Sequence, residues 1–270
     1  MRKKPSPKKS SESSLRILFL FCVIVITAIG LSLGYRLFTL MRDSMYDSKH
    51  NFIIAFTYRN DVDFVEVNSE QKTLSHLQVR GGNNLINTKK EVGVLSDTDI
   101  SLSKPFSLDS LSNYFTDATW HKNNIKSNLN IFDLYRLHFA TKHISPQSIT
   151  SERIHIPIDT SLSSTMLEQL FLDETIDQEN KTVSIINGTG VVGLGTRLER
   201  ALSNMGINVI SVKNADRVES ASVINYNGEE SYTLDRLQNL LLIPTNQTSS
   251  VALSDIIILI GKDMSQTTRF

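Results

Sequence analysis

The sequence predicts an α/β protein with a single N-terminal transmembrane helix, a mixed α/β middle module and a small C-terminal α/β domain with a partly parallel sheet. Three observations predict this class. Residues 17–35 contain no charged side chain, short apolar runs separated by polar turns recur after residue 50, and strand-like and helix-like segments alternate after residue 181. Alternating strands and helices are typical of a partly parallel sheet covered by helices.

The first segment, residues 1–16, is predicted to be a basic cytoplasmic tail. It is rich in Lys and Arg and has one acid, Glu12. A segment of this composition cannot bury a core. Basic residues collect on the cytoplasmic side of a membrane span. The tail should therefore lie on the cytoplasmic side of the cell membrane, and the later domains should be extracytoplasmic.

Residues 17–36 are predicted to be the transmembrane helix, in contact with membrane lipid. The uncharged run would extend roughly 28 Å at 1.5 Å per residue, close to the thickness of the hydrocarbon core. The competing interpretation is a cleaved secretory signal, whose apolar region is shorter and ends at small residues. Arg36, Leu37 and Phe38 follow this run instead, which favours an uncleaved single-pass anchor.

Charge and cysteine usage exclude several classes of function. The chain has 28 basic and 28 acidic residues. Six of the basic residues and one of the acidic residues lie in the tail. The remainder therefore has 22 basic and 27 acidic residues and a formal charge of −5. This balance argues against nucleic acid as a partner. Cys22, the one cysteine, lies inside the predicted span. The histidines show no helical metal-ligand spacing, so no metal site is predicted.

The middle module, residues 50–172, is predicted from strand-like runs and from two segments with helical periodicity. Strands are expected at 51–57, 63–67, 73–79 and 151–156, and helices at 108–114 and 131–142. The charged, apolar-poor stretch 173–180 offers little to bury. We therefore predict that it is a linker between the two modules.

The C-terminal domain is predicted to cover residues 181–264. Strands are expected at 183–186, 208–212, 223–226 and 255–261, and helices at 190–205 and 232–242. Gly206 should end the first helix as its C′ residue. The last strand is almost wholly aliphatic, so it should lie at the centre of the sheet.

A glycine-rich turn links the first strand and helix of this domain. Gly188, Gly190 and Gly193 have the G-x-G-x-x-G spacing of dinucleotide sites. We expect no dinucleotide, because the stretch from Asn180 to Phe270, about 90 residues, is too short for two nucleotide-binding halves. Dinucleotide sites have an acid about 20 residues after the glycines, and Lys213 occupies that position here. The turn would also lie on the opposite side of the membrane from cytoplasmic NAD and ATP. The glycines should serve the backbone; anion binding by these glycines and Asn187 at the helix N-terminus is the alternative.

Several ordered blocks carry a family resemblance: the N-G-T-G turn after a strand, the strand end V-I-S-V-K-N-A-D, the short strand V-I-N-Y, and a terminal strand followed by Gly-Lys-Asp. With these blocks, residues 181–264 resemble the C-terminal domain of the LytR family of bacterial envelope proteins. The resemblance implies a protein of the cell envelope.

Arg59 and Asp61, followed after a second strand by Arg80, faintly resemble the R-x-D-T and P-R-D-T elements of the LytR-CpsA-Psr phosphotransferases. In that family, arginines hold the pyrophosphate of a polyprenyl-linked glycan and carboxylates hold Mg²⁺. Here Val62 replaces the threonine, and V-R-G-G lacks the second aspartate. We interpret residues 50–172 as a degenerate LytR-CpsA-Psr-like module, with these three residues as the candidates for catalysis.

Two functions stay open. The first is a membrane-anchored bacterial envelope protein with a non-catalytic binding or scaffolding role in cell-wall assembly. Its partners would be wall polymer or envelope proteins, and it would need no cofactor. The second is a phosphotransferase that attaches polyprenyl-linked glycopolymer to the cell wall and requires Mg²⁺. The incomplete set of arginines and carboxylates favours the first, and the ligand of the C-terminal domain is left open.

Overall fold

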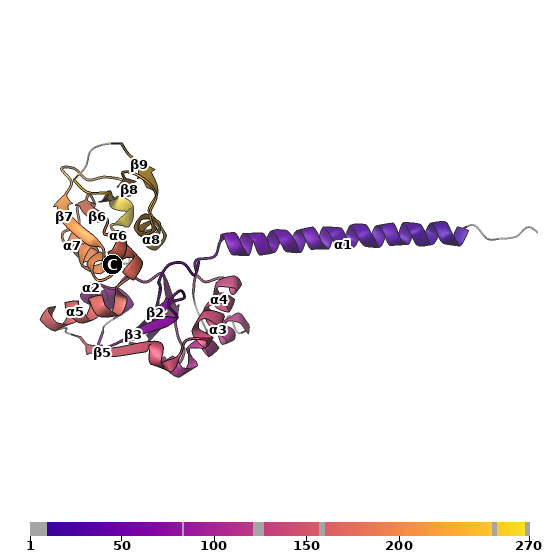
Figure 1. The fold of residues 1–270 in the computed structure, drawn as a ribbon, viewed down its shortest axis with the longest axis horizontal. Coiled ribbons are helices and arrows are strands. Elements are labelled where there is room, and N and C mark those ends of the chain that lie inside the picture. The colour runs from indigo at the N-terminus through magenta and orange to yellow at the C-terminus, as the bar shows by residue number, and fades with distance from the viewer. Residues whose placement is uncertain (1–9, 83, 121–126, 157–159, 250–252, 268–270) are drawn as a thin grey trace, which may run out of the picture.

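The computed structural model describes residues 10–82, 84–120, 127–156, 160–249 and 253–267. One long helix, α1 (Ser10–Arg42), projects from two neighbouring α/β modules, each built on a five-stranded sheet (Figure 1). The predicted fold class is confirmed.

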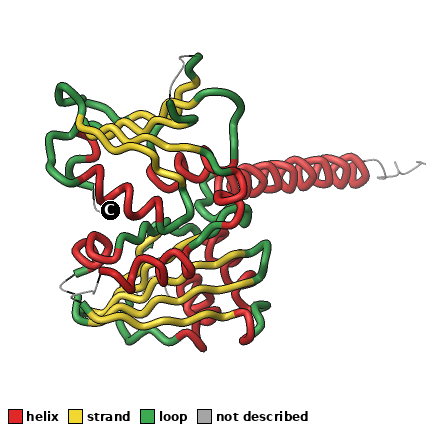
Figure 2. Tube along the Cα trace, turned by 60° about the vertical axis from the view of Figure 1, so that its left-hand side comes forward, coloured by secondary structure: helices red, strands yellow, loops and turns green. Residues whose placement is uncertain are grey.

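Helix α1 extends beyond both ends of the predicted span 17–36. Residues 10–16 of the predicted tail are helical, and residues 1–9 lie outside the described part. Apolar side chains are exposed along the helix, from Ile17 at 69% to Met41 at 58%. Figure 2 shows most of α1 extending away from both modules. By its length and composition, the stretch Arg16–Arg42 could cross a membrane.

The middle sheet has the strand order β4-β1-β2-β3-β5. Strands β1 (Phe52–Tyr58), β2 (Asp61–Asn68) and β3 (Thr73–Arg80) form an antiparallel meander. Strand β4 (Thr98–Ser101) pairs parallel to β1, and β5 (Ile149–His155) pairs parallel to β3. The sequence TDIS of β4 has no apolar run, which explains why this strand was not predicted.

Helices cover both faces of the middle sheet. They are α2 (Leu85–Val92), α3 (Leu111–Trp120), α4 (Ile131–Lys142) and α5 (Thr160–Phe171), with short 3₁₀ turns at Leu108–Ser110 and Pro146–Ser148. Phe56 packs with Phe115 of α3 and Leu137 of α4 on one face. Phe64 packs with Phe171 of α5 on the other face. Strand β1 is buried on both sides, and its residues 52–56 accordingly form a continuous apolar run.

The predicted linker, residues 173–180, is instead an ordered element. It forms α6 (Glu174–Glu179), and the Asp173 side chain caps it by accepting hydrogen bonds from the amides of Thr175 and Ile176. Ile176 is only 1% exposed and lies in the core of the C-terminal module. A capping aspartate and one buried apolar side chain hold this stretch on the C-terminal module. Its charged composition gave no indication of this packing.

The C-terminal sheet has the strand order β7-β6-β10-β8-β9. Its strands are β6 (Thr182–Asn187), β7 (Asn208–Asn214), β8 (Val223–Tyr226), β9 (Thr245–Gln247) and β10 (Ile256–Ile260). Strand β6 is parallel to β7 and to β10, whereas β8 is antiparallel to β10 and parallel to β9. The aliphatic strand β10 is central, as predicted.

Both longer helices of this module pack on one face of its sheet. Helix α7 (Leu194–Ser203) supplies Leu198, and α8 (Tyr232–Leu241) supplies Leu237, to one core with Ile258 of β10. A 3₁₀ turn, Lys262–Met264, follows β10. Burial alternates along β10. The opposite face of the sheet is therefore only partly covered, unlike either face of the middle sheet.

Candidate functional site

A hollow of about 230 Å³ lies at the carboxyl ends of β6 and β7. The glycine turn forms one wall, and residues 214–218, which begin with the last residue of β7, form the other. All four residues predicted for this site, Asn187, Gly188, Gly190 and Gly193, line the hollow. The carboxyl ends of parallel strands are also where α/β sheets commonly bind ligands.

The glycine turn is held by hydrogen bonds within itself. The Asn187 Oδ1 atom accepts from the amide and the hydroxyl of Thr189 at 3.1 and 2.6 Å, and Nδ2 donates to the carbonyl of Val191 at 2.9 Å. Gly190 has a φ of +78°, which a residue with a Cβ adopts only under strain. These contacts support the interpretation that the glycines serve the backbone.

Two groups at the hollow can still meet a ligand. Helix α7 begins after Gly193 without a side-chain cap, so its first amides carry the partial positive charge of a helix N-terminus. Arg217 lines the hollow and its side chain is 85% exposed, with Nε 3.0 Å from Glu219 Oε1. Asp216 also lines the hollow and would oppose an anion. The volume lies below the range of roughly 300–1,000 Å³ typical of small-molecule pockets.

Asp61 and Arg80, but not Arg59, are brought together in the middle module. Arg80 Nε lies 3.6 Å from Asp61 Oδ2 on the adjacent strand. Arg59 lies in the turn between β1 and β2 at a φ of +55°, with its guanidinium 5.2 Å from the centre of the Tyr58 ring. Within the described residues, no hydrogen bond or ion pair joins Arg59 to the other two.

Asp63, which was not predicted as a site residue, is the buried centre of this cluster. Its carboxylate is 3.2 Å from Arg80 Nη1 and 2.9 Å from His76 Nε2, and His76 Nδ1 is 2.8 Å from Ser151 Oγ. These are the residue types of a serine-hydrolase triad, but there the carboxylate holds Nδ1 and the serine faces Nε2. Ser151 also lies within the regular strand β5. The hydrogen bonds of Asp63, His76 and Ser151 therefore connect β5 to β3 and β2.

Mg²⁺, which the phosphotransferase alternative requires, does not fit this cluster. Mg²⁺ is coordinated by oxygen atoms, commonly those of carboxylates. The carboxylate of Asp63 is instead contacted by Arg80, His76 and Gln78. Asp61 faces the same guanidinium. Across the described parts of the chain, no group of three or more His, Cys, Asp or Glu side chains is placed to hold a metal ion.

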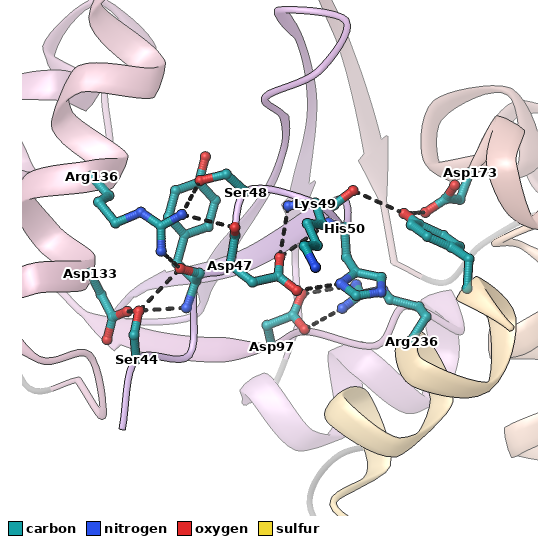
Figure 3. Close-up of polar contacts among 12 residues, drawn as sticks. Ser44, Asp47, Ser48, Lys49, His50, Asp97, Asp133, Arg136, Asp173 and Arg236 are labelled. Atoms are coloured by element: carbon teal, nitrogen blue, oxygen red, sulfur yellow. Dashed lines mark hydrogen bonds and ion pairs between the residues drawn. The ribbon is translucent and has the colours of Figure 1, made fainter. Parts of the chain in front are cut away.

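A polar joint connects α1 with both modules; it comprises residues 43–50 together with Asp97, Asp133, Arg136, Asp173, Tyr232 and Arg236. Figure 3 shows the polar contacts among most of these residues. The first part of the joint holds the chain as it leaves α1. The hydroxyl of Ser44 and the amide of Tyr46 donate to Asp133 Oδ1 at 2.5 and 3.1 Å. Arg136 donates to the carbonyls of Tyr46 and Asp47 at 2.5 and 2.8 Å. Helix α4 therefore fixes the exit of α1.

The second part of the joint is a bidentate ion pair between Arg236 of α8 and Asp97 before β4, with Nη1–Oδ1 and Nη2–Oδ2 distances of 2.6 and 3.0 Å. Asp97 Oδ2 also accepts a hydrogen bond from the amide of Ile53 at 2.7 Å. Burial by itself would lower the pKa of Arg236, but the adjacent Asp97 carboxylate outweighs it and raises that pKa. The pair joins the modules with two charge-assisted hydrogen bonds.

The third part of the joint surrounds His50. Its ring lies 4.5 Å from the ring of Tyr232, whose hydroxyl donates to Asp173 Oδ2 at 2.8 Å. Burial, reinforced by the charge of Asp173, raises the pKa of Tyr232. Burial would also raise the pKa of Asp47, but hydrogen bonds from the His50 ring and from the amides of His50 and Lys49 outweigh it and lower that pKa.

The joint was not found in the sequence, because its members are spread along the chain without a motif. One signal was available. Arg236 occurs on the apolar stripe of α8, where Thr233, Leu237 and Leu240 are also buried. A cation on the buried side of an amphipathic helix requires a buried partner, although only the structure identifies that partner as Asp97.

Residues 180–263 match the LytR_C family model, described as "LytR cell envelope-related transcriptional attenuator". This match confirms the predicted family resemblance. No curated protein matches the chain. A LytR_C domain together with a possible N-terminal membrane helix is consistent with an envelope protein.

Three solved structures show limited similarity. They are the transcriptional regulator yvhJ from Bacillus subtilis (11% identity, TM-score 0.30), the Lin1025 protein from Listeria innocua (9%, 0.28) and the putative transcriptional factor Lmo1026 from Listeria monocytogenes (9%, 0.28). Each alignment covers 39% of this chain, and 83%, 83% and 80% of the respective structures.

Proposed function

We propose that this chain is a single-pass protein of a bacterial cell membrane, with a cytoplasmic N-terminus and extracytoplasmic modules, that binds or scaffolds envelope components without catalysis. The observation that carries the proposal is the engagement of Arg80 by Asp61 and Asp63. An arginine that binds a pyrophosphate turns its N–H donors to the ligand. Arg80 instead directs its donors to carboxylates of its own sheet, and two carboxylates facing one guanidinium do not attract an anion.

The polar joint supports a scaffolding role. It holds the exit of α1 on α4 and fastens the C-terminal module to the middle module through Arg236 and Asp97. The side chain of Asn204, the C-cap of α7, adds a hydrogen bond to the carbonyl of Gly93 at 2.7 Å. These contacts give both modules a defined position relative to α1, which supports a scaffolding role.

The partly covered face of the C-terminal sheet supports a macromolecular partner such as wall polymer or another envelope protein. Strand β10 alternates buried and half-buried side chains, and the half-buried Ile257 lies between Ser184 of β6 and Asn225 of β8 on this face, which therefore combines apolar and polar surface. The hollow of about 230 Å³ at the glycine turn is small for a dinucleotide. We propose no dinucleotide, nucleic acid or cofactor as a ligand.

The proposal is tested by co-sedimenting the full-length protein, purified in detergent, with isolated bacterial cell wall, and by mass spectrometry of lipids that copurify with it. The protein should pellet with wall, or cross-link to envelope proteins in cells, and retain no polyprenyl phosphate or pyrophosphate. A retained polyprenyl pyrophosphate that is lost in Arg80→Ala would instead establish the phosphotransferase alternative.

A further inference from the structure

Helix α4 presents an apolar stripe to its surroundings. Ile131, Tyr135 and Phe139 are spaced by four residues, so they lie along one side of the helix. Their side chains are 44%, 59% and 43% exposed. The rings of Tyr135 and Phe139 lie 4.6 Å apart, so the apolar surface is continuous. Contiguous apolar surface on a folded module is typical of an interaction site.

The stripe is held next to the end of α1. Asn130, the N-cap of α4, donates through Nδ2 to the carbonyls of Leu40 and Asp43 at 2.9 and 3.2 Å. Asp133 and Arg136 bind the residues that follow α1. Helix α4 therefore cannot swing away from the exit of α1. Figure 1 shows α3 and α4 on the side of the middle module from which α1 extends.

The charges beside the stripe suit an anionic lipid surface. Lys142 and His143 are exposed at the end of α4, and the one acid of this helix, Asp133, is buried. A neighbouring hollow of about 490 Å³ is lined by Lys72, Arg136 and other residues, none of them acidic. Aromatic side chains prefer the headgroup region of a bilayer, and basic side chains there attract anionic lipids.

We infer that the stripe of Ile131, Tyr135 and Phe139 lies on the outer surface of the same bilayer that α1 spans, with anionic phospholipid headgroups beside the basic residues of the neighbouring hollow. The inference rests on the membrane anchoring proposed above. A lipid occupant is favoured over a protein, because the stripe begins beside the exit of α1 and the hollow next to Tyr135 and Phe139 is lined by basic and no acidic residues.

The test uses the full chain in vesicles of phosphatidylcholine and phosphatidylglycerol, with Cys22→Ser as the background. An environment-sensitive fluorophore is attached to one new cysteine at a time, in Val25→Cys for the span, Tyr135→Cys for the stripe and Glu152→Cys for the exposed part of β5. Lipids that carry a nitroxide near the headgroup quench nearby probes. We expect strong quenching and a blue-shifted emission at position 135, and neither at position 152.

The outcomes separate the inference from the anchoring on which it rests. If nitroxides deep in the bilayer quench position 25 while headgroup nitroxides quench positions 135 and 152 equally, the anchor stands and the docking of α4 is wrong. If position 25 is not quenched, the anchoring itself is wrong.

Substitution provides a second readout. Phe139→Asp should abolish the quenching at position 135, whereas Val192→Asp, at an apolar side chain that is 95% exposed in the C-terminal module, should leave it unchanged. Unaltered quenching in Phe139→Asp, with an unchanged melting temperature, would overturn the inference.

Discussion

Arg236 and Asp97 form a bidentate ion pair across the boundary between the two modules, and their side chains are only 2% and 7% exposed. Their separation by 139 positions in the chain makes this contact a property of the tertiary structure alone. Because both groups have already lost their water, the loss of either partner would leave the other charge buried and unpaired.

Arg236→Met should therefore lower the free energy of unfolding by about 3–5 kcal/mol. Urea unfolding of the full-length protein in detergent measures this effect. Arg217→Met is the matched control, because Arg217 pairs with Glu219 at the surface with 85% of its side chain exposed. The control should change stability by less than about 0.5 kcal/mol. Equal effects of the two substitutions would mean that the pair does not hold the modules together.

Gly190→Val should destabilise the C-terminal module by about 1–3 kcal/mol, because a β-branched residue is strained at the φ of +78° found there. Gly190→Asn is the matched control, since asparagine tolerates this region of φ and should be less costly. The difference between the two melting temperatures measures the backbone contribution. If both substitutions are neutral, the turn does not require glycine.

The same turn distinguishes a structural role from a ligand site. Millimolar NAD or ATP should not change the melting temperature of the wild-type protein. A ligand present at 100 times its dissociation constant would add about 2.7 kcal/mol, so binding would be easily seen. A clear shift with pyrophosphate or undecaprenyl phosphate would favour the anion-binding alternative.

Stability should depend on pH through Glu66. Burial, with a smaller contribution from the charge of Asp173, raises the pKa of Glu66 from 4.5 to about 8, although the Asn51 amide opposes this shift. The folded state therefore retains a proton that the unfolded state releases above pH 4.5. The stability contributed by this proton is fully present below pH 4.5 and is lost as the pH rises towards 8.

Relative to Glu66→Gln, the wild type should lose about 1.4 kcal/mol of unfolding free energy per pH unit across this window. Urea unfolding at several pH values from 5 to 8 measures the slope. Glu70→Gln, at an exposed turn, should keep the wild-type slope. A slope for Glu66→Gln that equals that of the wild type would show that Glu66 is ionised in the folded protein.

Limited proteolysis should spare residues 173–180. Ile176 and Asp173 are 1% and 2% exposed, and the Glu179 carboxylate accepts hydrogen bonds from the amides of Tyr232 and Thr233 at the start of α8. A protease requires an extended, accessible chain, which this helix does not offer. Ile176→Asp should open the segment and permit cleavage there. Rapid wild-type cleavage at this position would restore the linker interpretation.

Topology should follow the basic tail. Protease added to cells in which the outer face of the cell membrane is accessible should remove both modules and leave the N-terminal tail protected. Neutral replacements of Lys3, Lys4, Lys8 and Lys9 should produce a mixed orientation, because the remaining difference in charge between the two flanks is small. Protection of the modules in the wild type would reverse the proposed orientation.

The sequence by itself determined those parts of the fold that depend on local pattern. The uncharged run 17–35, the periodicity of α4, the aliphatic run of β10 and the glycine turn each specify a structure through neighbouring residues. A helix face or a buried strand follows from the spacing of apolar side chains, whatever the rest of the chain does. The matching bounds of α4 and the central place of β10 follow from this rule.

Only the tertiary structure decided how the charged residues pair and where polar segments dock. A carboxylate has no sequence preference for one arginine over another, so the pairing of Arg80 with Asp61 and Asp63, and of Arg236 with Asp97, depends on which strands and helices become neighbours. Helix α6 illustrates the same limit, because its one buried residue, Ile176, is stabilised by a core assembled from distant segments. The free energy of burial comes from contacts across the fold, so it cannot be predicted from the composition of a segment.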